Sequence, residues 1–479
     1  MKAILDHMPI HIYNTLTGEK EEFKPLKEGK VGMYNCGPTV YDYAHVGNLR
    51  AYVLADIIRR VFEYNDYNVT QIINITDVGH LVSDGDDGED KMTKALKREN
   101  KPLTLEAMDE VSSFYTEKFI NDLKQLNIEM PSAFPKASRH IAEDIEIIQK
   151  LEENGYAYAT SDGVYFDTKK YKAYGKLGHI SLDDSKNESR IVINPEKRNL
   201  TDFTLWKLDK NLGWESPWGK GFPGWHIECS AMSRKYLGQP FDIHTGGVDH
   251  IPVHHNNEIA QSEAAYGEEL AHYWIHGAMM NINDGKKMSK SSGGFLKLAN
   301  LEEAGISPIA FRYWLLTSHY RTQVNFTVEA VKAAQNAFIR LVETFIRLGE
   351  VQNEHVHAVA EPKDYAKEFE EKITNDFDTA GAVALMWDLI KDHSVVAKEK
   401  IELLLSFDEV FGLGLHVVKD MKDEMNEAIP AEITALAEAR EIARAAKEFD
   451  KADALRKEIA SRGYEVKDNP EGYILRVVK

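Results

Sequence analysis

The chain has 479 residues, of which 43% are hydrophobic and 28% charged, a composition typical of soluble globular proteins. At about 150 residues per unit the length predicts roughly three domains, and because neither a secretory leader nor the roughly 18 unbroken apolar residues of a membrane span occurs, we expect a cytoplasmic protein without a membrane partner. The formal charge of -19 excludes a chain that is basic overall, so a nucleic-acid partner would have to meet locally basic surface.

The first predicted elements are those of a parallel sheet. An apolar run over 31–34 ends in Cys36-Gly37-Pro38, a helical stripe of apolar residues runs from about 45 to 64, and a second apolar run covers 69–75. Strand, helix and strand in this order favour a Rossmann-type α/β domain, whose ligands bind beyond the carboxyl ends of the strands.

His45-Val46-Gly47-Asn48 lies where the first predicted strand turns into the first helix. Free backbone N–H groups and the helix dipole favour a phosphate at such a point. Gly47 permits close approach, and His45 can donate hydrogen bonds to phosphate oxygens. Taken alone, these four residues favour an ordinary helix start.

The acidic stretch 78–90 follows the second predicted strand. Four aspartates between Asp84 and Asp90 suggest a calcium loop. The EF-hand spacing fails, however, because Gly88 stands at the fifth ligand position. We therefore interpret this stretch as a solvated, flexible loop.

The next part of the chain changes to long helices and a hairpin. Apolar residues keep helical spacing over 108–123 and again over 141–151, and Ser161-Asp162-Gly163 turns between two short strand patterns. The sheet pattern returns at 241–243 and 273–280. We therefore expect the helical region to be an insertion that splits the α/β domain into two halves.

A lysine- and serine-rich loop, Lys287-Met288-Ser289-Lys290-Ser291, follows the second half of the sheet. Its two ammonium groups and two hydroxyls could close over a triphosphate and stabilise the charge of departing pyrophosphate. The pattern alone leaves open an ordinary solvated surface loop.

The rest of the chain is predicted to be mainly helical. An apolar stripe over 331–345 faces a bundle, and Phe377, Val383, Met386 and Leu389 supply parts of another. After a polar linker, two helices and a hairpin, Tyr464 to Val478, form a small final module.

Only two cysteines occur, Cys36 and Cys229, which excludes a disulfide scaffold and leaves buried thiols, metal ligands or one nucleophile. His254 and Glu258 are four positions apart and would share one face of a helix, so they could bind one metal. Two thiolates, one imidazole and one carboxylate would favour zinc over magnesium or calcium. Spacing alone leaves open that each cysteine is simply a small buried hydrophobe.

Longer motifs surround these elements: Tyr34-Asn35-Cys36-Gly37-Pro38-Thr39-Val40-Tyr41-Asp42, Asn74-Ile75-Thr76-Asp77, Gly224-Trp225-His226-Ile227-Glu228-Cys229-Ser230-Ala231-Met232, and Phe311-Arg312-Tyr313 before Ser318-His319-Tyr320-Arg321. Together with the histidine and lysine-serine motifs in this order, they resemble the cysteinyl-tRNA synthetases, a family of class I aminoacyl-tRNA synthetases. The sequence departs from the family at Asn48, where a second histidine is usual, and in the length of the acidic stretch.

The resemblance implies ATP-dependent activation of L-cysteine and its transfer to the 3′ end of tRNA(Cys), with release of AMP and pyrophosphate. It implies a monomer with one zinc ion, and Mg2+ bound with ATP. ATP would be bound by His45, Gly47, Asn48, Lys287, Ser289 and Lys290, with His45, Asn48, Lys287 and Lys290 as the catalytic residues. The amino-acid pocket would be framed by Gly37, Thr76 and Trp225, and zinc would be held by Cys36, Cys229, His254 and Glu258, leaving His244, His250 and His255 as bystanders or supports of the ligands.

We therefore expect an α/β protein with a split Rossmann-type parallel-sheet catalytic domain, an inserted connective domain, a helical bundle and a small C-terminal α+β module. The expected boundaries are 1–95 and 223–320 for the catalytic halves, 96–222 for the insertion, 321–418 for a tRNA-binding bundle and 428–479 for an anticodon-binding module.

Three other functions stay open. A cysteine ligase with the same activating core could pass cysteine to a small amine, and it would need no anticodon reader. A zinc hydrolase would use His254 and Glu258, but the chain has no His-Glu-x-x-His pair. A non-catalytic RNA-binding protein would not explain the lysine- and serine-rich loop.

Overall fold

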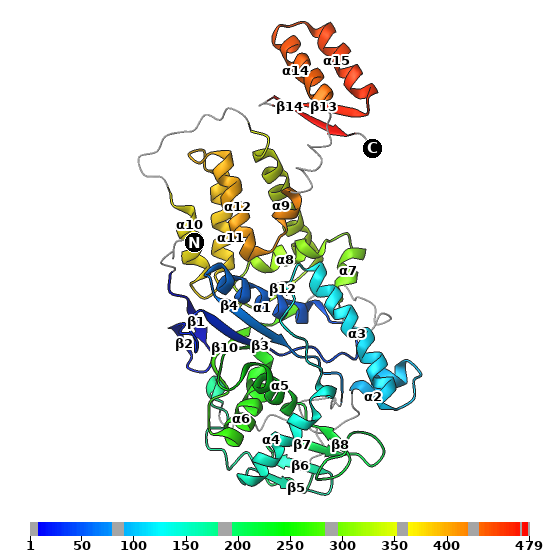
Figure 1. Ribbon diagram of the computed structural model, residues 1–479, viewed down its shortest axis with the longest axis vertical. Helices are drawn as coiled ribbons and strands as arrows, with labels where there is room; N and C mark the ends of the chain where they lie inside the picture. The colour runs from blue at the N-terminus through cyan, green and yellow to red at the C-terminus, as the bar shows by residue number, and fades with distance from the viewer. Residues whose placement is uncertain are drawn as a thin grey trace. The chain divides into compact units, whose positions relative to one another are not determined.

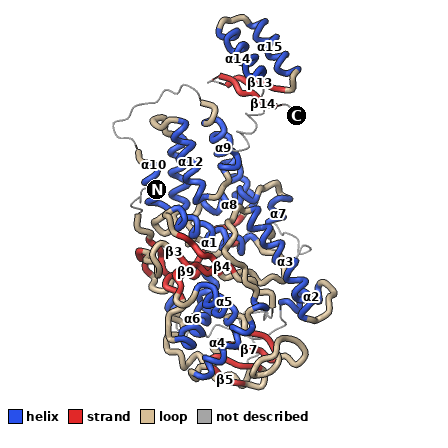
Figure 2. Tube along the Cα trace, in the orientation of Figure 1, coloured by secondary structure: helices blue, strands red, loops and turns tan. Residues whose placement is uncertain are grey.

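The computed structural model describes residues 8–78, 91–180, 194–282, 296–351, 363–419, 431–469 and 472–477 (Figure 1, Figure 2). The chain forms two compact units, one of Met1–Gln335 with Glu370–Ala382 and one of Asn336–Phe369 with Val383–Lys479. Lys287, Ser289, Lys290 and nearly all of the acidic stretch 78–90 lie outside the described residues. Among the helices that are described, none combines the length and apolarity needed to cross a membrane. The expected domain boundaries stay a prediction.

A sheet of four parallel strands lies at the centre of the first unit (Figure 2). Its order is β10-β9-β3-β4, with bounds β3 (Lys30–Asn35), β4 (Asn68–Ile73), β9 (Phe241–Gly247) and β10 (Ala271–Gly277). Helix α1 (Val46–Tyr64) connects β3 to β4, and α6 (Asn256–Tyr266) connects β9 to β10. The two halves meet where β3 pairs with β9, so the predicted split α/β fold is confirmed.

An insertion separates the two halves in sequence. Its helices are α2 (Lys91–Arg98), α3 (Leu105–Gln125) and α4 (Ile141–Glu153), and its antiparallel sheet is β5 (Ala157–Ala159), β6 (Gly163–Phe166), β7 (Phe203–Leu208) and β8 (Gly221–Pro223). Helix α5 (Ile227–Leu237) then leads back to the central sheet. Ile148, Leu151, Phe166 and Trp206 are buried in one core. The predicted hairpin is confirmed, and β7 and β8 extend it into a larger sheet.

The predicted strand pattern at 273–280 is wrong in one respect, because it covers two strands. β10 ends at Gly277, and β11 (Met280–Ile282) pairs instead with β12 (Val324–Phe326). Between them the Ala278 N–H donates to the Tyr320 carbonyl, which takes the backbone out of the central sheet.

Between residues 320 and 420 the described chain is mainly helical, as predicted. Besides the elements above, the described chain before residue 412 has one further hairpin and six further α-helices. They are a hairpin of β1 (His11–Asn14) and β2 (Glu19–Glu22), and the helices α7 (Leu298–Glu303), α8 (Pro308–Leu316), α9 (Val328–Leu348), α10 (Tyr365–Ile373), α11 (Thr379–Lys391) and α12 (Ala397–Phe411). On α9, Val331, Leu341 and Phe345 are buried. Phe377 does not belong to a helical stripe: it precedes α11 with a φ of 56° and packs on Phe62 and Tyr320.

The C-terminal module has the predicted α+β composition. Helices α14 (Ala431–Ala445) and α15 (Phe449–Ser461) are followed by an antiparallel pair of β13 (Tyr464–Asn469) and β14 (Gly472–Val477). Ile433, Ala437, Ile459 and Val466 are buried together, so the module has a hydrophobic core of its own.

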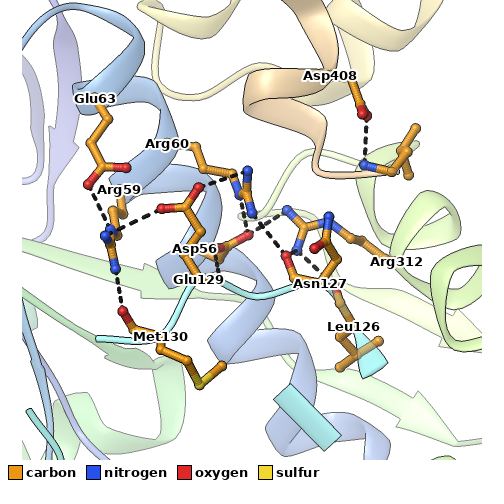
Figure 3. A network of polar contacts seen from close by, with 11 residues as sticks. Asp56, Arg59, Arg60, Glu63, Leu126, Asn127, Glu129, Met130, Arg312 and Asp408 are labelled. Atoms are coloured by element: carbon orange, nitrogen blue, oxygen red, sulfur yellow. Dashed lines mark hydrogen bonds and ion pairs between the residues drawn. The ribbon is translucent and has the colours of Figure 1, made fainter. Parts of the chain in front are cut away.

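A buried polar network fixes α1 within the first unit (Figure 3). The Asp56 carboxylate pairs with Arg60 on the same helix and with Arg312 on α8, and it accepts the Glu129 N–H. Arg312, which is fully buried, also donates to the carbonyls of Leu126 and Asn127 just after α3. Since α1 carries the histidine motif at its first turn, these contacts also fix the position of that motif.

Candidate functional site

A cavity of about 480 Å³ opens at the carboxyl ends of the parallel strands. It is lined by residues that follow all four of these strands: Cys36 after β3, Thr76 after β4, His250 after β9 and Ala278 after β10. The cavity lies where the chain reverses its direction of travel across the sheet, between β3 and β9, which is the usual ligand site of such sheets.

Four side chains with metal-binding atoms converge at one end of this cavity. The ligand atoms of Cys36, Cys229, His254 and Glu258 lie within 4.8 Å of one another. His254 Nε2 is 3.0 Å from Glu258 Oε1, and Cys36 Sγ is 3.7 Å from the same oxygen. The structure thus brings together the four residues that the family resemblance assigns to zinc.

The local backbone explains how His254 and Glu258 share one face. Residues Ile251–His255 form a π-helical turn that runs directly into α6. Such turns are rare in proteins as a whole, but many of them lie at functional sites, because the extra residue changes the direction in which the side chains project. Here both His254 and the next residue, His255, are buried next to Glu258.

A ring of histidines surrounds the four side chains. His244 Nε2 is 2.9 Å from Glu258 Oε2, and His255 Nε2 is 3.3 Å from Cys36 Sγ. Cys36, His244, His255 and Glu258 form a second set whose ligand atoms also lie within 4.8 Å of one another. Behind them, His226 shares a hydrogen bond with His254, and His276 with His255. His244 and His255 are therefore in direct contact with the expected ligands.

The pKa values in this cluster are strongly shifted. The hydrogen bond with Cys36 lowers the pKa of Cys229 to about 6, although burial opposes this effect. Burial would lower the pKa of His254, but Glu258 and Cys229 raise it to about 10. For the Glu258 carboxyl, burial acts in the opposite direction and would raise the pKa, but His244 and His254 hold this pKa well below its usual range. Cys229 and Glu258 are therefore held in the anionic forms that bind a cation, whereas His254 is held protonated and burial raises the pKa of Cys36, so these two would have to lose protons when a metal binds.

Gly37, Thr76 and Trp225 all line the cavity beside this cluster. The Trp225 ring lies 4.6 Å from the His254 ring, measured between centroids. At Gly37 a Cβ would lie 1.5 Å from the Asn74 carbonyl oxygen, and the Gly37 N–H donates to Asn74 Oδ1 at 2.7 Å. Glycine is required there because the next strand end packs against its backbone, a reason that differs from the expected approach of a substrate.

His45 and Asn48 cap the first turn of α1. His45 Nδ1 accepts from the Asn48 N–H at 3.1 Å, and Asn48 Oδ1 accepts from the His45 N–H at 3.3 Å. Because Nδ1 is an acceptor, the proton of the neutral ring stands on Nε2. Burial lowers the pKa of His45, with Asp249 opposing, so the neutral form is favoured. A Cβ on Gly47 would lie 2.9 Å from His45 Nδ1, so glycine leaves room for this cap.

The lysine- and serine-rich loop itself lies outside the described residues, but its flanks reach the same cavity. Met280 before it and Lys297 after it both line the cavity. The Val46 N–H donates to the Leu296 carbonyl at 2.8 Å, and His45 forms a β-bridge with Lys297. The residues that follow the loop, Leu296 and Lys297, are therefore joined to the histidine motif at the start of α1.

Sequence reasoning missed several residues of the cavity. Tyr43, Lys91, Asp249 and Lys297 line it, and His276 supports the histidine ring from behind. Tyr43 directly follows one of the quoted motifs, which could have drawn attention to it. Lys91 and Lys297 stand in no pattern that distinguishes them from surface lysines, so the sequence alone holds no signal for them.

Comparisons with known proteins cover nearly the whole chain. Residues 22–336 match the family model described as the tRNA synthetases class I (C) catalytic domain, and residues 426–474 match the Cysteinyl-tRNA ligase anticodon binding domain. The Cysteine--tRNA ligase 1 of Burkholderia lata is 44% identical over 97% of this chain and 96% of its own length. The Cysteine--tRNA ligase of Treponema denticola is 41% identical over 96% of this chain and 98% of its own length.

Solved structures agree on the fold. Mycobacterium tuberculosis methionyl-tRNA synthetase, in complex with methionyl-adenylate, matches with a TM-score of 0.58 and 15% identity over 82% of this chain and 93% of that chain. With the catalytic-domain match and relatives of such identity and coverage, the chain belongs to the cysteinyl-tRNA synthetase family of class I aminoacyl-tRNA synthetases.

Proposed function

We propose that this protein activates L-cysteine with ATP and transfers it to the 3′ end of tRNA(Cys). The cysteine carboxylate attacks the α-phosphorus of ATP and pyrophosphate leaves. The 3′-terminal adenosine hydroxyl of tRNA then attacks the cysteinyl adenylate, and AMP leaves. The observation that carries this proposal is one cavity lined both by the cysteine- and histidine-containing cluster and by the histidine motif at the start of α1.

The cluster of Cys36, Cys229, His254 and Glu258 fits zinc. Its donor set is two sulfurs, one imidazole and one carboxylate, which matches the preference of zinc and suits magnesium or calcium poorly. The second set, with His244 and His255, has only one sulfur, so we assign the metal to the set with both cysteines. His244 would then orient Glu258 through its second oxygen.

A metal at this place would solve a problem of selectivity. Cysteine and serine differ by one atom, and pockets that rely on shape separate such near-isosteres by only about a hundredfold. Bound zinc supplies a soft Lewis acid that binds a thiolate sulfur strongly and a hydroxyl weakly. Thr76 and Trp225 would hold the rest of the amino acid beside it, since both line the cavity next to the cluster.

ATP would bind across the start of α1. His45 holds a proton on Nε2 and Asn48 keeps its amide N–H groups outside the cap, so both can donate to phosphate oxygens. Gly47 lines the cavity at the same turn. Lys287, Ser289 and Lys290 would stabilise the leaving pyrophosphate, and Mg2+ would accompany the nucleotide. The Leu296–Val46 hydrogen bond supports this assignment, because it holds one end of their loop at the cavity.

The test combines two measurements on the full-length protein. Cysteine-dependent exchange of labelled pyrophosphate into ATP reports activation, and charging of tRNA(Cys) reports transfer. Both should occur, and serine should support neither at a comparable rate. Exchange without charging would favour a ligase that uses a small amine, and absence of cysteine-dependent exchange would remove the proposed activity altogether.

A further inference from the structure

Aromatic rings and cations alternate along one rim of the cavity, on a surface formed by the segment 41–43 and helices α2 and α3. The exposed rings are Tyr43, 36% exposed, and Phe114, 46% exposed. Their centroids are 6.4 Å apart, and Tyr115 lies 5.3 Å from Tyr43. We call these three rings the aromatic rim.

Each ring of this rim has a cation beside it. Lys297 Nζ lies 4.0 Å from the centroid of Tyr43, and Lys118 Nζ lies 5.2 Å from that of Phe114. The Arg98 guanidinium is 5.8 Å from the centroid of Tyr115. Such contacts orient the ammonium and guanidinium groups over ring faces. They place positive charge locally on a chain whose formal charge is -19.

The pattern continues from the rim into the cavity. Tyr41, Lys91 and Trp225 line its wall, and Lys91 Nζ lies 5.5 Å from the Tyr41 centroid and 5.8 Å from that of Trp225. Trp225 in turn packs against His254 of the metal-binding cluster. Rings and cations thus extend from an exposed surface of α3 to the place proposed for the substrate thiol.

Arg98 makes this surface a defined structure. It pairs with Asp42 at 3.0 Å and donates to the Tyr41 carbonyl at 2.8 Å and to the Tyr115 hydroxyl at 2.9 Å. Glu99 accepts from the same hydroxyl at 2.9 Å. Asp42 and Glu99 are therefore engaged by neighbouring side chains, and the rings keep fixed positions relative to one another.

Alternating rings and cations are the chemistry that binds single-stranded nucleic acid. Bases stack on aromatic faces whatever their sequence, and cations follow the phosphates. Double-stranded RNA would be recognised through its minor groove and backbone, for which exposed rings are unsuited. A peptide partner would give no reason for cations that lead into a cavity proposed for ATP.

We propose that Tyr43 and Phe114, supported by the buried Tyr115 and together with Lys118 and Lys297, bind the unpaired 3′ nucleotides of the RNA substrate and guide the terminal adenosine into the cavity. This proposal rests on the proposed function, because it names the surface by which the second substrate reaches the same site. The bases stack on the two exposed rings, Tyr43 and Phe114, and the lysines contact the phosphates between the bases.

The test combines one change in the protein with one change in the tRNA, and it compares the effects of each change alone and of both together, with the full-length protein. The first is Phe114→Ala, in a residue that does not line the cavity, and the second is a tRNA(Cys) trimmed of its unpaired 3′ nucleotides. Stacking on one base contributes about 1–3 kcal/mol, so Phe114→Ala should lower kcat/KM for charging of intact tRNA about tenfold or more. The affinity for trimmed tRNA should not change, because the nucleotides that Phe114 contacts are absent.

Further variants separate stacking from other effects. Phe114→Trp should restore charging and Phe114→Leu should not, since leucine keeps the apolar bulk without a ring. Lys118→Gln should reduce the slope of log K against log salt by about 0.7, the value for one phosphate contact in a single strand. As a matched control, Tyr236→Ala removes another exposed ring, 41% exposed on α5, and should leave charging unchanged.

Two results would overturn the proposal in distinguishable ways. Normal charging by Phe114→Ala, or equal weakening of intact and trimmed tRNA, would remove the aromatic rim from 3′-end binding while leaving the proposed function in place. The other result is wild-type protein that shows cysteine-dependent pyrophosphate exchange but charges no tRNA. It would show that tRNA is not the acceptor of cysteine, and it would overturn both that part of the proposed function and the RNA-binding surface.

Discussion

Individual side chains at this site serve two purposes at once. Cys36 ends β3 and offers its sulfur to the metal-binding cluster, while His255 contacts the same sulfur from the opposite half of the sheet. Glu258 uses one carboxylate oxygen towards His254 and the other towards His244. Because the groups are buried and share partners, removing one side chain leaves others unsatisfied, and effects at these positions will not be additive.

The metal assignment leads to a first prediction at this scale. Replacing Cys229 or His254 by alanine should abolish stoichiometric zinc or weaken its binding severely, since each supplies one of four protein ligands. Zinc content of the purified variants, measured by elemental analysis, checks this. His272→Ala, a more exposed histidine, is the control and should retain zinc. Stoichiometric zinc in both ligand variants would contradict the assignment.

Gly37 gives a second prediction, because its backbone packs against Asn74. In Gly37→Ala the added Cβ would lie 1.5 Å from the Asn74 carbonyl oxygen, so the two strand ends must move apart. Overpacking of this kind costs about 1–3 kcal/mol or more. We expect a lower melting temperature and a large loss of cysteine-dependent exchange. Gly32→Ala, within the strand β3 that precedes Gly37, is the matched control, since its Cβ would meet its nearest neighbour at 3.6 Å. Similar losses in both variants would contradict this explanation.

Among the elements, α1 is the one on which most of the site depends. Its first turn carries His45 and Asn48, and its middle is held by Asp56 in the network with Arg60 and Arg312 (Figure 3). The family motif around Phe311-Arg312-Tyr313 is thereby explained, because Arg312 is fully buried and connects α8, the end of α3 and α1. A position distant from the cavity can thus affect the ATP site through the helix it supports.

A third prediction tests that network. Arg312→Met keeps most of the side-chain volume and removes the charge. The buried Asp56 carboxylate then loses its ion pair with Arg312. Removing one partner of a buried pair costs about 3–5 kcal/mol. Thermal unfolding should therefore begin at clearly lower temperature. Arg198→Met removes a surface ion pair with Asp167, worth at most about 1 kcal/mol, and should unfold almost like the wild type. The prediction fails if the two variants shift the transition equally.

At the scale of the whole molecule, the parallel halves and the C-terminal module could be predicted from sequence, because strand and helix patterns such as those of β3, α1, α14 and α15 are local. The meeting of Cys36 with Cys229 could not be derived from spacing. Only the family resemblance assigned them to one site, since their approach depends on how β3 pairs with β9. The π-helical turn at 251–255 and the contacts of His276 escaped prediction for the same reason: tertiary packing decides them.

A fourth prediction concerns the separate roles of the cavity and of the C-terminal module. A chain that ends at Ala428 lacks α14, α15 and the final hairpin, which have a core of their own. The cavity residues all precede residue 380, so cysteine-dependent exchange should largely persist. Charging of tRNA should fall sharply, because residues 426–474 match an anticodon binding domain. Both activities are measured on a truncated protein whose melting curve shows that it is folded. Undiminished charging would exclude a role of the module in tRNA recognition.

The pairing of β3 with β9 also has a consequence during synthesis of the chain. β3 ends at Asn35 and β9 begins at Phe241, so the ribosome must add the whole insertion before the second strand exists. At about 5–20 residues per second, this interval lasts roughly 10–40 seconds. During that time one edge of β3 is without its neighbour, and Cys36 is without Cys229, His254 and Glu258. The site therefore cannot form on the first half of the nascent chain, and in the cell the protection of that strand edge and thiol depends on how quickly the second half follows.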